Sequence, residues 1–310
     1  MFELAVILLR FLQFAGVTAL LGASLFFLYA LPPTGVAAAH NIAWPRMLLL
    51  WGAAMLAISS AASIVTQTIV LAGSYQEGLT AEAIAFVALE TDIGHSAVVR
   101  IVAGAAAVVA LFAYRAGRPW WLTAAAGIVA CMSVPWMGHG AATEGPWWLP
   151  HLLSDLFHIA AASIWTGTLV GFALSLIVRR PGSTEFDHAL ERALAGFAGI
   201  GSVLVAILLA TGLANAWFIV GGPPPVQGLW ETAYGRVLSA KVAVFGLMLC
   251  LAAVNRFRLT PDLREVLDQS GASAVPLNRL RRSINVETSL GFAALALVSW
   301  LGTLAPPVAQ

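Results

Sequence analysis

The side chains best suited to metal chemistry in this sequence gather where one apolar segment ends and the next begins. Thioethers and imidazoles are ligands that suit copper, and ionisable groups within apolar segments are rare enough to require a functional reason. The residue types therefore predict a copper site. Its candidate residues are Met132, Met137, His139, His151, Asp155 and His158.

Three of these residues lie in an apolar stretch that we expect to be helical over residues 150–178. His151, Asp155 and His158 occupy positions i, i+4 and i+7, so they share one face of that helix. We expect His151 and His158 to bind the metal, and Asp155 to accept a hydrogen bond from a histidine N–H and fix its tautomer. A histidine at the end of a span is also often merely interfacial, and this alternative stays open for His151.

The other candidates end the preceding apolar segment. Met132 and His139 share a helix face if the helix continues through Pro135, where a kink is expected. We expect His139, Met132 and Met137 to complete the ligand set, the thioethers favouring Cu(I) and the imidazoles accepting either oxidation state. Methionine also fills gaps in packed cores, so packing is the alternative for Met132 and Met137.

Further polar side chains lie within other apolar segments. Asp155 requires a positive partner, for which Lys241 or Arg10 is the candidate, although long cationic side chains near span ends also snorkel to the headgroups. Glu287 lies near Asn255, and we favour a fixed polar pair closing the inner side over a transport carboxylate. The remaining candidates are Arg100, as a second charge, and His95, as an accessory ligand.

Composition identifies the kind of protein that positions these groups. The chain has 310 residues, of which 60% are hydrophobic and only 10% charged, and its mean hydropathy is +0.86. A soluble domain carries about 25% charged residues, so the chain is expected to be an all-α polytopic membrane protein. The formal net charge of +1 gives no indication of nucleic-acid binding.

Eight segments are long and apolar enough to cross a bilayer as helices, which takes about 20 residues each. They cover residues 4–30, 44–72, 95–115, 119–137, 150–178, 189–220, 234–255 and 284–304. Arginines gather in the loops after the third, fifth and seventh segments, while the loop after the second is acidic. Because basic loops stay in the cytoplasm, both termini are predicted to face the periplasm.

The two halves of the chain resemble each other, which predicts an internal repeat. Thr91-Asp-Ile-Gly94 before Arg100 matches Thr232-Ala-Tyr-Gly235 before Lys241. Gly22 likewise aligns with Gly167. An even number of spans in each unit gives two four-helix repeats in parallel orientation, over residues 1–145 and 146–310. The histidines then belong to the junction of the units and to the second one.

Several short motifs occur in an order and spacing typical of one family. They are Asp155-Leu-Phe-His158, Trp165-Thr-Gly167, Tyr234-Gly235 with Lys241, Asn255-Arg256-Phe-Arg-Leu-Thr260-Pro261, Arg281-Arg282 with Glu287, Leu301-Gly-Thr-Leu-Ala-Pro306-Pro307, and Thr91 and Gly94 with Arg100. Together they cover most of the chain, which resembles the CopD family of copper-resistance membrane proteins. The resemblance implies a bacterial inner-membrane protein that moves copper from the periplasm toward the cytoplasm. It also implies a separate periplasmic copper carrier of the CopC type as a partner.

Three functions stay open at this point. A copper permease is the leading hypothesis, and no enzyme activity is expected with it. The absence of a nucleotide-binding loop from the sequence argues against an ATP-driven pump. The alternative is a membrane b-type haem protein that passes electrons to copper or another acceptor, with His158 paired to His95 or His139 across the porphyrin. Copper sensing or storage without transport is the third.

Overall fold

The computed structural model describes residues 2–30, 43–114, 119–137, 143, 145–179, 184–220, 231–269 and 274–305. Within these ranges the regular structure is helical and contains no strand. Eight helical segments have the length and hydropathy to cross a membrane, and they confirm the eight predicted from the sequence. They are Glu3–Ala30, Trp44–Ala72, Asp92–Ala113, Trp120–Met137, Gly145–Val178, Glu185–Ile219, Ala233–Asp268 and Ala274–Leu301.

The spans consist of regular and irregular helical pieces. The first-half elements are α1 (Phe2–Val17), π-helix η1 (Thr18–Ala23), α2 (Ser24–Ala30), α3 (Trp44–Ala72), α6 (Asp92–Ala113), α7 (Trp120–Ser133) and 3-10 helix η2 (Val134–Met137). The second-half elements are 3-10 helix η3 (Gly145–Trp147), α8 (Trp148–Val178), α9 (Thr184–Val220), α11 (Ala233–Val254), π-helix η4 (Asn255–Leu259), α12 (Thr260–Asp268) and α13 (Ala274–Leu301). Two short helices that the sequence analysis did not predict, α4 (Tyr75–Gly78) and α5 (Ala81–Glu90), join α3 to α6.

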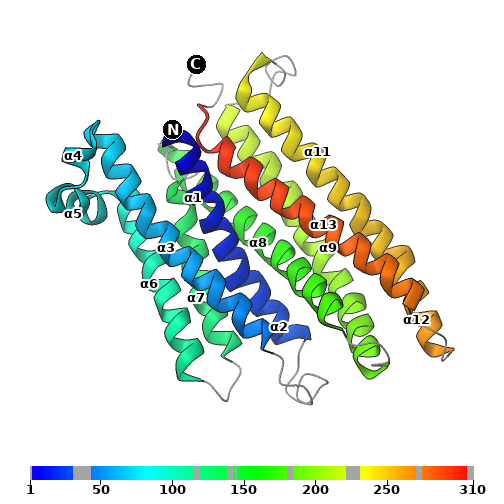
Figure 1. The fold of residues 1–310 in the computed structure, drawn as a ribbon. Helices are drawn as coiled ribbons and strands as arrows, with labels where there is room; N and C mark the ends of the chain where they lie inside the picture. Colours follow the sequence, from blue (N-terminus) through cyan, green and yellow to red (C-terminus); the bar gives the residue numbers. More distant parts are fainter. Residues whose placement is uncertain are drawn as a thin grey trace.

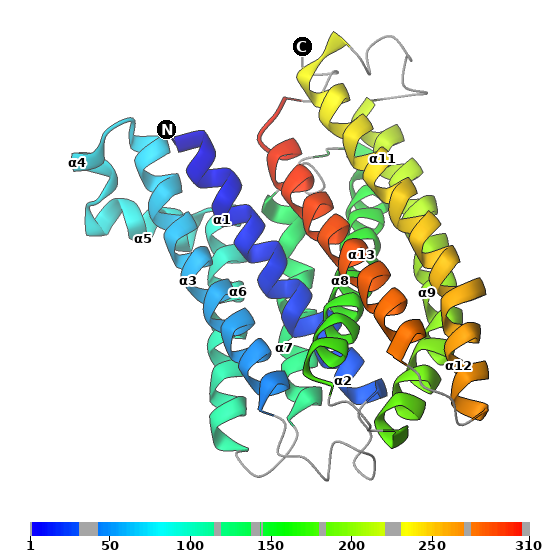
Figure 2. The same cartoon turned by 45° about the vertical axis from the view of Figure 1, so that its right-hand side comes forward.

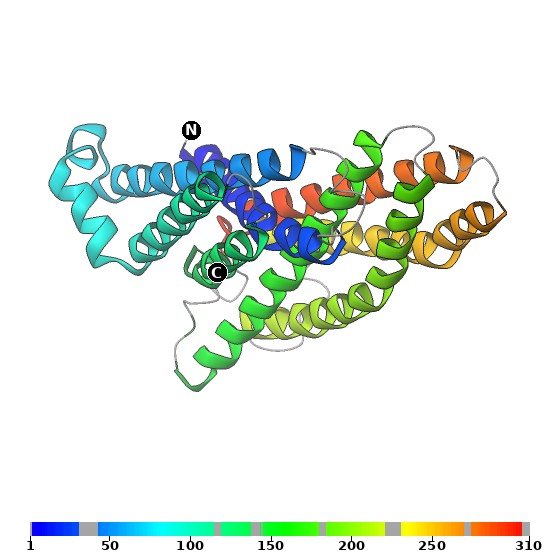
Figure 3. The same cartoon turned by 90° about the horizontal axis from the view of Figure 1, so that it is seen from below.

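The spans pack in two groups with α1 and α8 between them. In the first group α3 packs on both α1 and α6, and α6 packs on α7; in the second, α8 packs on α9 and α13, and α13 packs on α11. In Figure 2, α3, α6 and α7 lie apart from α9, α11 and α13. Figure 3 shows that the bundle is elongated when seen from below. The predicted repeat and the boundary between residues 145 and 146 stay predictions.

One end of the bundle is called here the terminal end. Figure 1 shows that α1 begins and α13 ends there, beside α4 and α5, while α12 lies at the opposite end. The matched motifs of the sequence analysis start helices at the terminal end. The Thr91 hydroxyl accepts from Gly94 N and the Thr232 hydroxyl from Gly235 N, each over 3.0 Å. Both threonines are therefore helix N-caps.

The first span and α8 cross with their backbones in direct contact. A Cβ on Gly22 of η1 would lie 2.1 Å from Ser163 O and 2.8 Å from the Gly167 Cα. A Cβ on Gly167 would lie 2.6 Å from the Gly22 Cα. Glycine is thus required on both sides, because any side chain would force the helices apart. This crossing fixes α8 against the first half.

Helix α7 ends at Ser133, before Pro135, and the chain continues as the 3-10 helix η2. The last carbonyls of a helix have no partner within it, and here two arginines from other spans supply donors. Arg100 donates to Ser133 O over 3.1 Å, and Arg10 donates to Met137 O. These cations also face the negative end of the α7 dipole. Arg10 therefore has a hydrogen-bond partner within the protein, which simple snorkelling to the headgroups did not predict.

Candidate functional site

His158 lies at the interface of α8 and α9, where its tautomer is fixed by geometry. Its Nδ1 lies 2.9 Å from Thr211 Oγ1, and that hydroxyl donates its own proton to Ile207 O over 2.6 Å. A hydroxyl carries one proton, so Thr211 Oγ1 accepts from His158 Nδ1–H. The lone pair of the neutral ring is then on Nε2, which makes no hydrogen bond with the residues that the structure describes. A histidine that donates from one ring nitrogen and offers the other is the arrangement found in metal ligands.

Asp155 lies one turn nearer the terminal end than His158, and its side chain also contacts α9. Its Oδ1 accepts from Asn215 Nδ2 over 3.3 Å. Asp155 is predicted from the sequence to be the acceptor that orients a histidine, but Thr211 orients His158 instead. Lys241 of α11 and Arg10 of α1 are the positive partners that the sequence predicts for this carboxylate. Neither forms a direct ion pair with it in the described part of the chain.

His151 faces α9 as well, but at a different level. It is 2% exposed, its Nδ1 lies 2.6 Å from Thr143 Oγ1, and its ring stacks on Phe218 at a centroid distance of 5.0 Å. Seven residues separate His151 from His158, which is about 10 Å along a helix. Metal–nitrogen bonds are about 2 Å long. The two imidazoles therefore belong to successive positions along α8.

The methionines do not join these histidines. Met132 is 57% exposed on the outer surface of α7. Met137 packs against the core that α1, α3 and α7 form, and its carbonyl accepts from Arg10. His139 lies outside the described residues. Among those that are described, no three histidine, cysteine, aspartate or glutamate side chains come close enough to hold one ion. The converged Met/His set expected from the sequence includes His139 and therefore stays a prediction.

Two of the other candidates lie in the first half. Arg100 is 1% exposed and, besides Ser133, is 3.3 Å from Ser96 Oγ, so it anchors α6 to α7. His95 opens α6, is exposed, and places its Nε2 2.6 Å from Leu89 O. Because α6 packs chiefly on α3, α5 and α7, His95 is not positioned opposite His158. The haem alternative gains no support from this pair.

A second polar group lies deeper in the bundle, below an apolar layer. Glu287 of α13 is 2% exposed; its Oε1 accepts from Trp165 Nε1 over 3.1 Å and its Oε2 from Asn255 Nδ2 over 2.8 Å. Trp165 follows His158 on α8 by seven residues, or about 10 Å. Its ring packs edge-on against Phe245, with the centroids 6.0 Å apart, and the surrounding layer includes Leu208. The expected pairing of Asn255 with Glu287 is present, with Trp165 as a third member that the sequence analysis missed.

Arg179 and Asp187 connect α8 to α9 at the opposite end of the bundle. The guanidinium of Arg179 donates to both carboxylate oxygens of Asp187, which is 1% exposed. This hydrogen-bonded carboxylate raises the pKa of Arg179. The two helices that hold His158 and Thr211 are therefore fixed to each other at this end.

Comparison with known proteins identifies relatives over the whole chain. Residues 1–149 match the family model "Copper resistance protein D-like, N-terminal domain", and residues 191–301 match "Copper resistance protein D". The copper resistance protein D of Pseudomonas syringae pv. tomato is 32% identical over 303 residues, which are 97% of this chain and 96% of that protein. No solved structure matches.

Two further relatives match over 172 residues at 30% identity. They are the inner membrane protein YebZ of Escherichia coli K12, where the match covers 55% of this chain and 54% of the relative, and the copper transport protein CutJ of Bacillus subtilis 168, where it covers 55% and 28%. These relatives are named for copper resistance and copper transport or for their membrane, and none for an enzyme activity. Together with the eight apolar helices, they indicate a multi-pass protein of the inner membrane. The chain belongs to the copper resistance protein D (CopD) family.

Proposed function

We propose that this protein carries copper ions across the inner membrane, from the periplasm toward the cytoplasm, and that His158 is its central copper ligand. The observation that carries the proposal is the Nε2 of His158, which has no hydrogen-bond partner among the described residues while Nδ1 is held by Thr211, itself bonded to Ile207 O. An oriented imidazole with an available lone pair suits either oxidation state of copper. The relatives named for copper resistance and copper transport supply the identity of the ion.

The proposed path follows one face of α8. Copper arrives at the terminal end, which we assign to the periplasm together with both termini, and reaches His151 before His158. The sequence also predicts His139 and Met137 as ligands of the arriving ion. A separate CopC-type carrier would deliver the ion there, as the family resemblance implies. Asp155, with Lys241 and Arg10 acting on it, sets the charge beside the ion.

The apolar layer around Trp165 and Phe245 then closes the path, and Glu287 with Asn255 lies on the far side. Carboxylate and amide oxygens are harder ligands than imidazole, so copper is held less firmly there. Weaker binding beyond the closed layer favours release toward the cytoplasm. In this proposal the copper chemistry belongs to the second unit, residues 146–310, while the first unit, residues 1–145, supports α8 through the Gly22–Gly167 contact.

The proposal is tested by measuring copper in purified protein and copper uptake into proteoliposomes. His158→Ala is expected to abolish both, because no described side chain replaces Nε2. Thr211→Val removes the acceptor that fixes the tautomer and is expected to weaken copper affinity by about 10–100-fold. Thr211→Ser retains the hydroxyl and is expected to retain the affinity.

His188→Ala is the matched histidine control, because His188 lies near the opposite end of the bundle on α9. It is expected to bind and transport copper normally. Normal copper content and uptake in His158→Ala would contradict the proposed site. Copper bound by the wild-type protein but never delivered to the vesicle interior would instead favour storage or sensing.

A further inference from the structure

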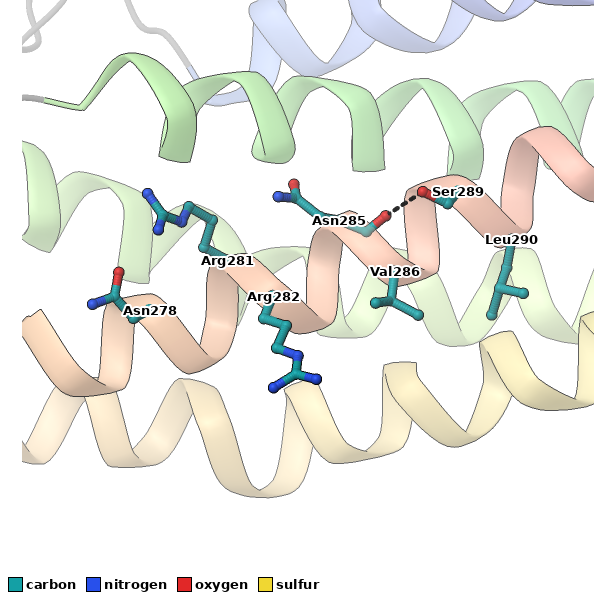
Figure 4. A pocket seen from close by; sticks show the side chains of 7 residues that line it. All are labelled: Asn278, Arg281, Arg282, Asn285, Val286, Ser289 and Leu290. Carbon is teal, nitrogen blue, oxygen red and sulfur yellow. Dashed lines mark hydrogen bonds between the residues drawn. The ribbon is translucent and has the colours of Figure 1, made fainter.

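A groove of about 620 Å³ opens along α13 near the opposite end of the bundle. Its lining comes from this one helix, and Figure 4 shows the side chains that line it. Arg282, Val286 and Leu290 form one row at i, i+4 and i+8, and beside them runs a polar row. The polar row consists of Asn278, Arg281, Asn285 and Ser289.

Among the residues that the structure describes, no carboxylate neutralises the positive charge of the groove. Arg281 and Arg282 are both exposed, and no acidic side chain lines the groove. Within the described ranges the only ion pairs are Arg179–Asp187 and Arg264–Glu191, so neither groove arginine is paired with a carboxylate. Arg281 and Arg282 are neighbours in sequence, and Figure 4 shows their side chains on the two sides of the groove, one in each row. Guanidinium N–H donors on both sides favour an anionic ligand between them, and phosphate suits their planar, multi-donor geometry.

The row of Arg282, Val286 and Leu290 changes from polar to apolar along the membrane normal. Arg281 and Arg282 lie near the start of α13, whereas Val286 and Leu290 lie one to two turns toward the centre of the span. From Asn278 to Leu290 the helix rises about 18 Å, enough for a phosphate headgroup and the first part of an acyl chain. We propose that this groove binds one anionic phospholipid, with its phosphate on the two arginines and a chain along Val286 and Leu290.

The binding test needs no copper and is therefore independent of the proposed transport. Purified protein in neutral detergent is titrated with phosphatidylglycerol or with phosphatidylcholine, and bound lipid is counted by native mass spectrometry. The wild type is expected to retain one phosphatidylglycerol in preference to phosphatidylcholine. Arg281→Gln with Arg282→Gln is expected to weaken phosphatidylglycerol binding about 30-fold, since each basic residue near an anionic lipid surface strengthens binding about 5-fold.

Arg258→Gln with Arg279→Gln is the matched control. Both arginines are exposed and outside the groove lining, so this variant loses the same charge and is expected to bind normally. Val286→Trp keeps every charge, fills the apolar part of the groove and is expected to weaken binding. Equal losses in the two arginine pairs would overturn the proposal in favour of diffuse attraction. Equal retention of both lipids, or competition by glycerol 3-phosphate without acyl chains, would also overturn it.

Discussion

The substitution Trp165→Phe tests whether one hydrogen bond holds α8 to α13 beneath the proposed copper site. Trp165 is 3% exposed, and its Nε1 donates to Glu287 Oε1 over 3.1 Å. Phenylalanine retains an aromatic ring against Phe245 but has no donor, so Glu287 keeps only the 2.8 Å bond from Asn255. Leaving a buried acceptor without its donor costs about 1–3 kcal/mol. We expect the free energy of unfolding to fall by at least that amount.

The matched control is Trp120→Phe. Trp120 is also buried, at 8% exposure, but its Nε1 has no hydrogen-bond partner among the described residues. Both substitutions remove the same ring atoms, whereas only Trp165→Phe breaks a hydrogen bond. Unfolding is followed by far-UV circular dichroism as sodium dodecyl sulfate is added to mixed micelles. The difference in unfolding free energy between the two variants is expected to be about 1–3 kcal/mol.

Equal losses in the two variants would refute this reasoning, because the lost ring volume alone would then account for the effect. A double-mutant cycle with Glu287→Leu adds an independent check. If the bond exists, its coupling energy appears as non-additivity between Trp165→Phe and Glu287→Leu. Additive effects would mean that the indole and the carboxylate do not interact in the folded protein.

Two further substitutions test the contacts that fix α8 and α7. Gly167→Ala brings a Cβ within 2.6 Å of the Gly22 Cα, and it is expected to lower the free energy of unfolding by about 1–3 kcal/mol in the same assay. Gly199→Ala is the control, because nothing lies within 4 Å of a Cβ there, and it should show no such loss. Arg100→Met removes the donor to Ser133 O, so amide exchange over residues 134–137 is expected to become faster in hydrogen-exchange mass spectrometry; unchanged protection there would show that Arg100 does not hold the end of α7.

The spans were predictable because each one depends only on the residues within it. A run of about 20 apolar residues has few alternatives to a membrane helix, since its backbone groups must be satisfied internally. The irregular pieces were not predictable in this way. The π-helices η1 and η4 and the 3-10 helix η2 depend on what packs against them. Pro135 did indicate a disturbance, but only the structure shows that α7 ends before it.

The candidate site was predictable only in part. His158 and Asp155 were identified because ionisable groups within a span are rare and usually functional. Their partners Thr211 and Asn215 share one face of α9, but the register between α8 and α9 is a tertiary property that one helix's periodicity does not contain. The same limit explains why the exposure of Met132 was not predicted. Periodicity gives the spacing of residues along a helix, but it does not show which face of that helix contacts a neighbour.

Helix α8 links these observations, because its two sides are fixed by different means. On the side of the first half, the Gly22–Gly167 contact joins backbone to backbone and leaves no room for adjustment. On the other side, His158 and Trp165 are held by single hydrogen bonds to α9 and α13, and the spans containing α9 and α11 are the least buried of the eight. Hydrogen bonds exchange partners more readily than close-packed backbones separate. In the proposed transport, α8 therefore remains in place as the carrier of the ligands, and the apolar layer around Trp165 opens by displacement of the second-half helices.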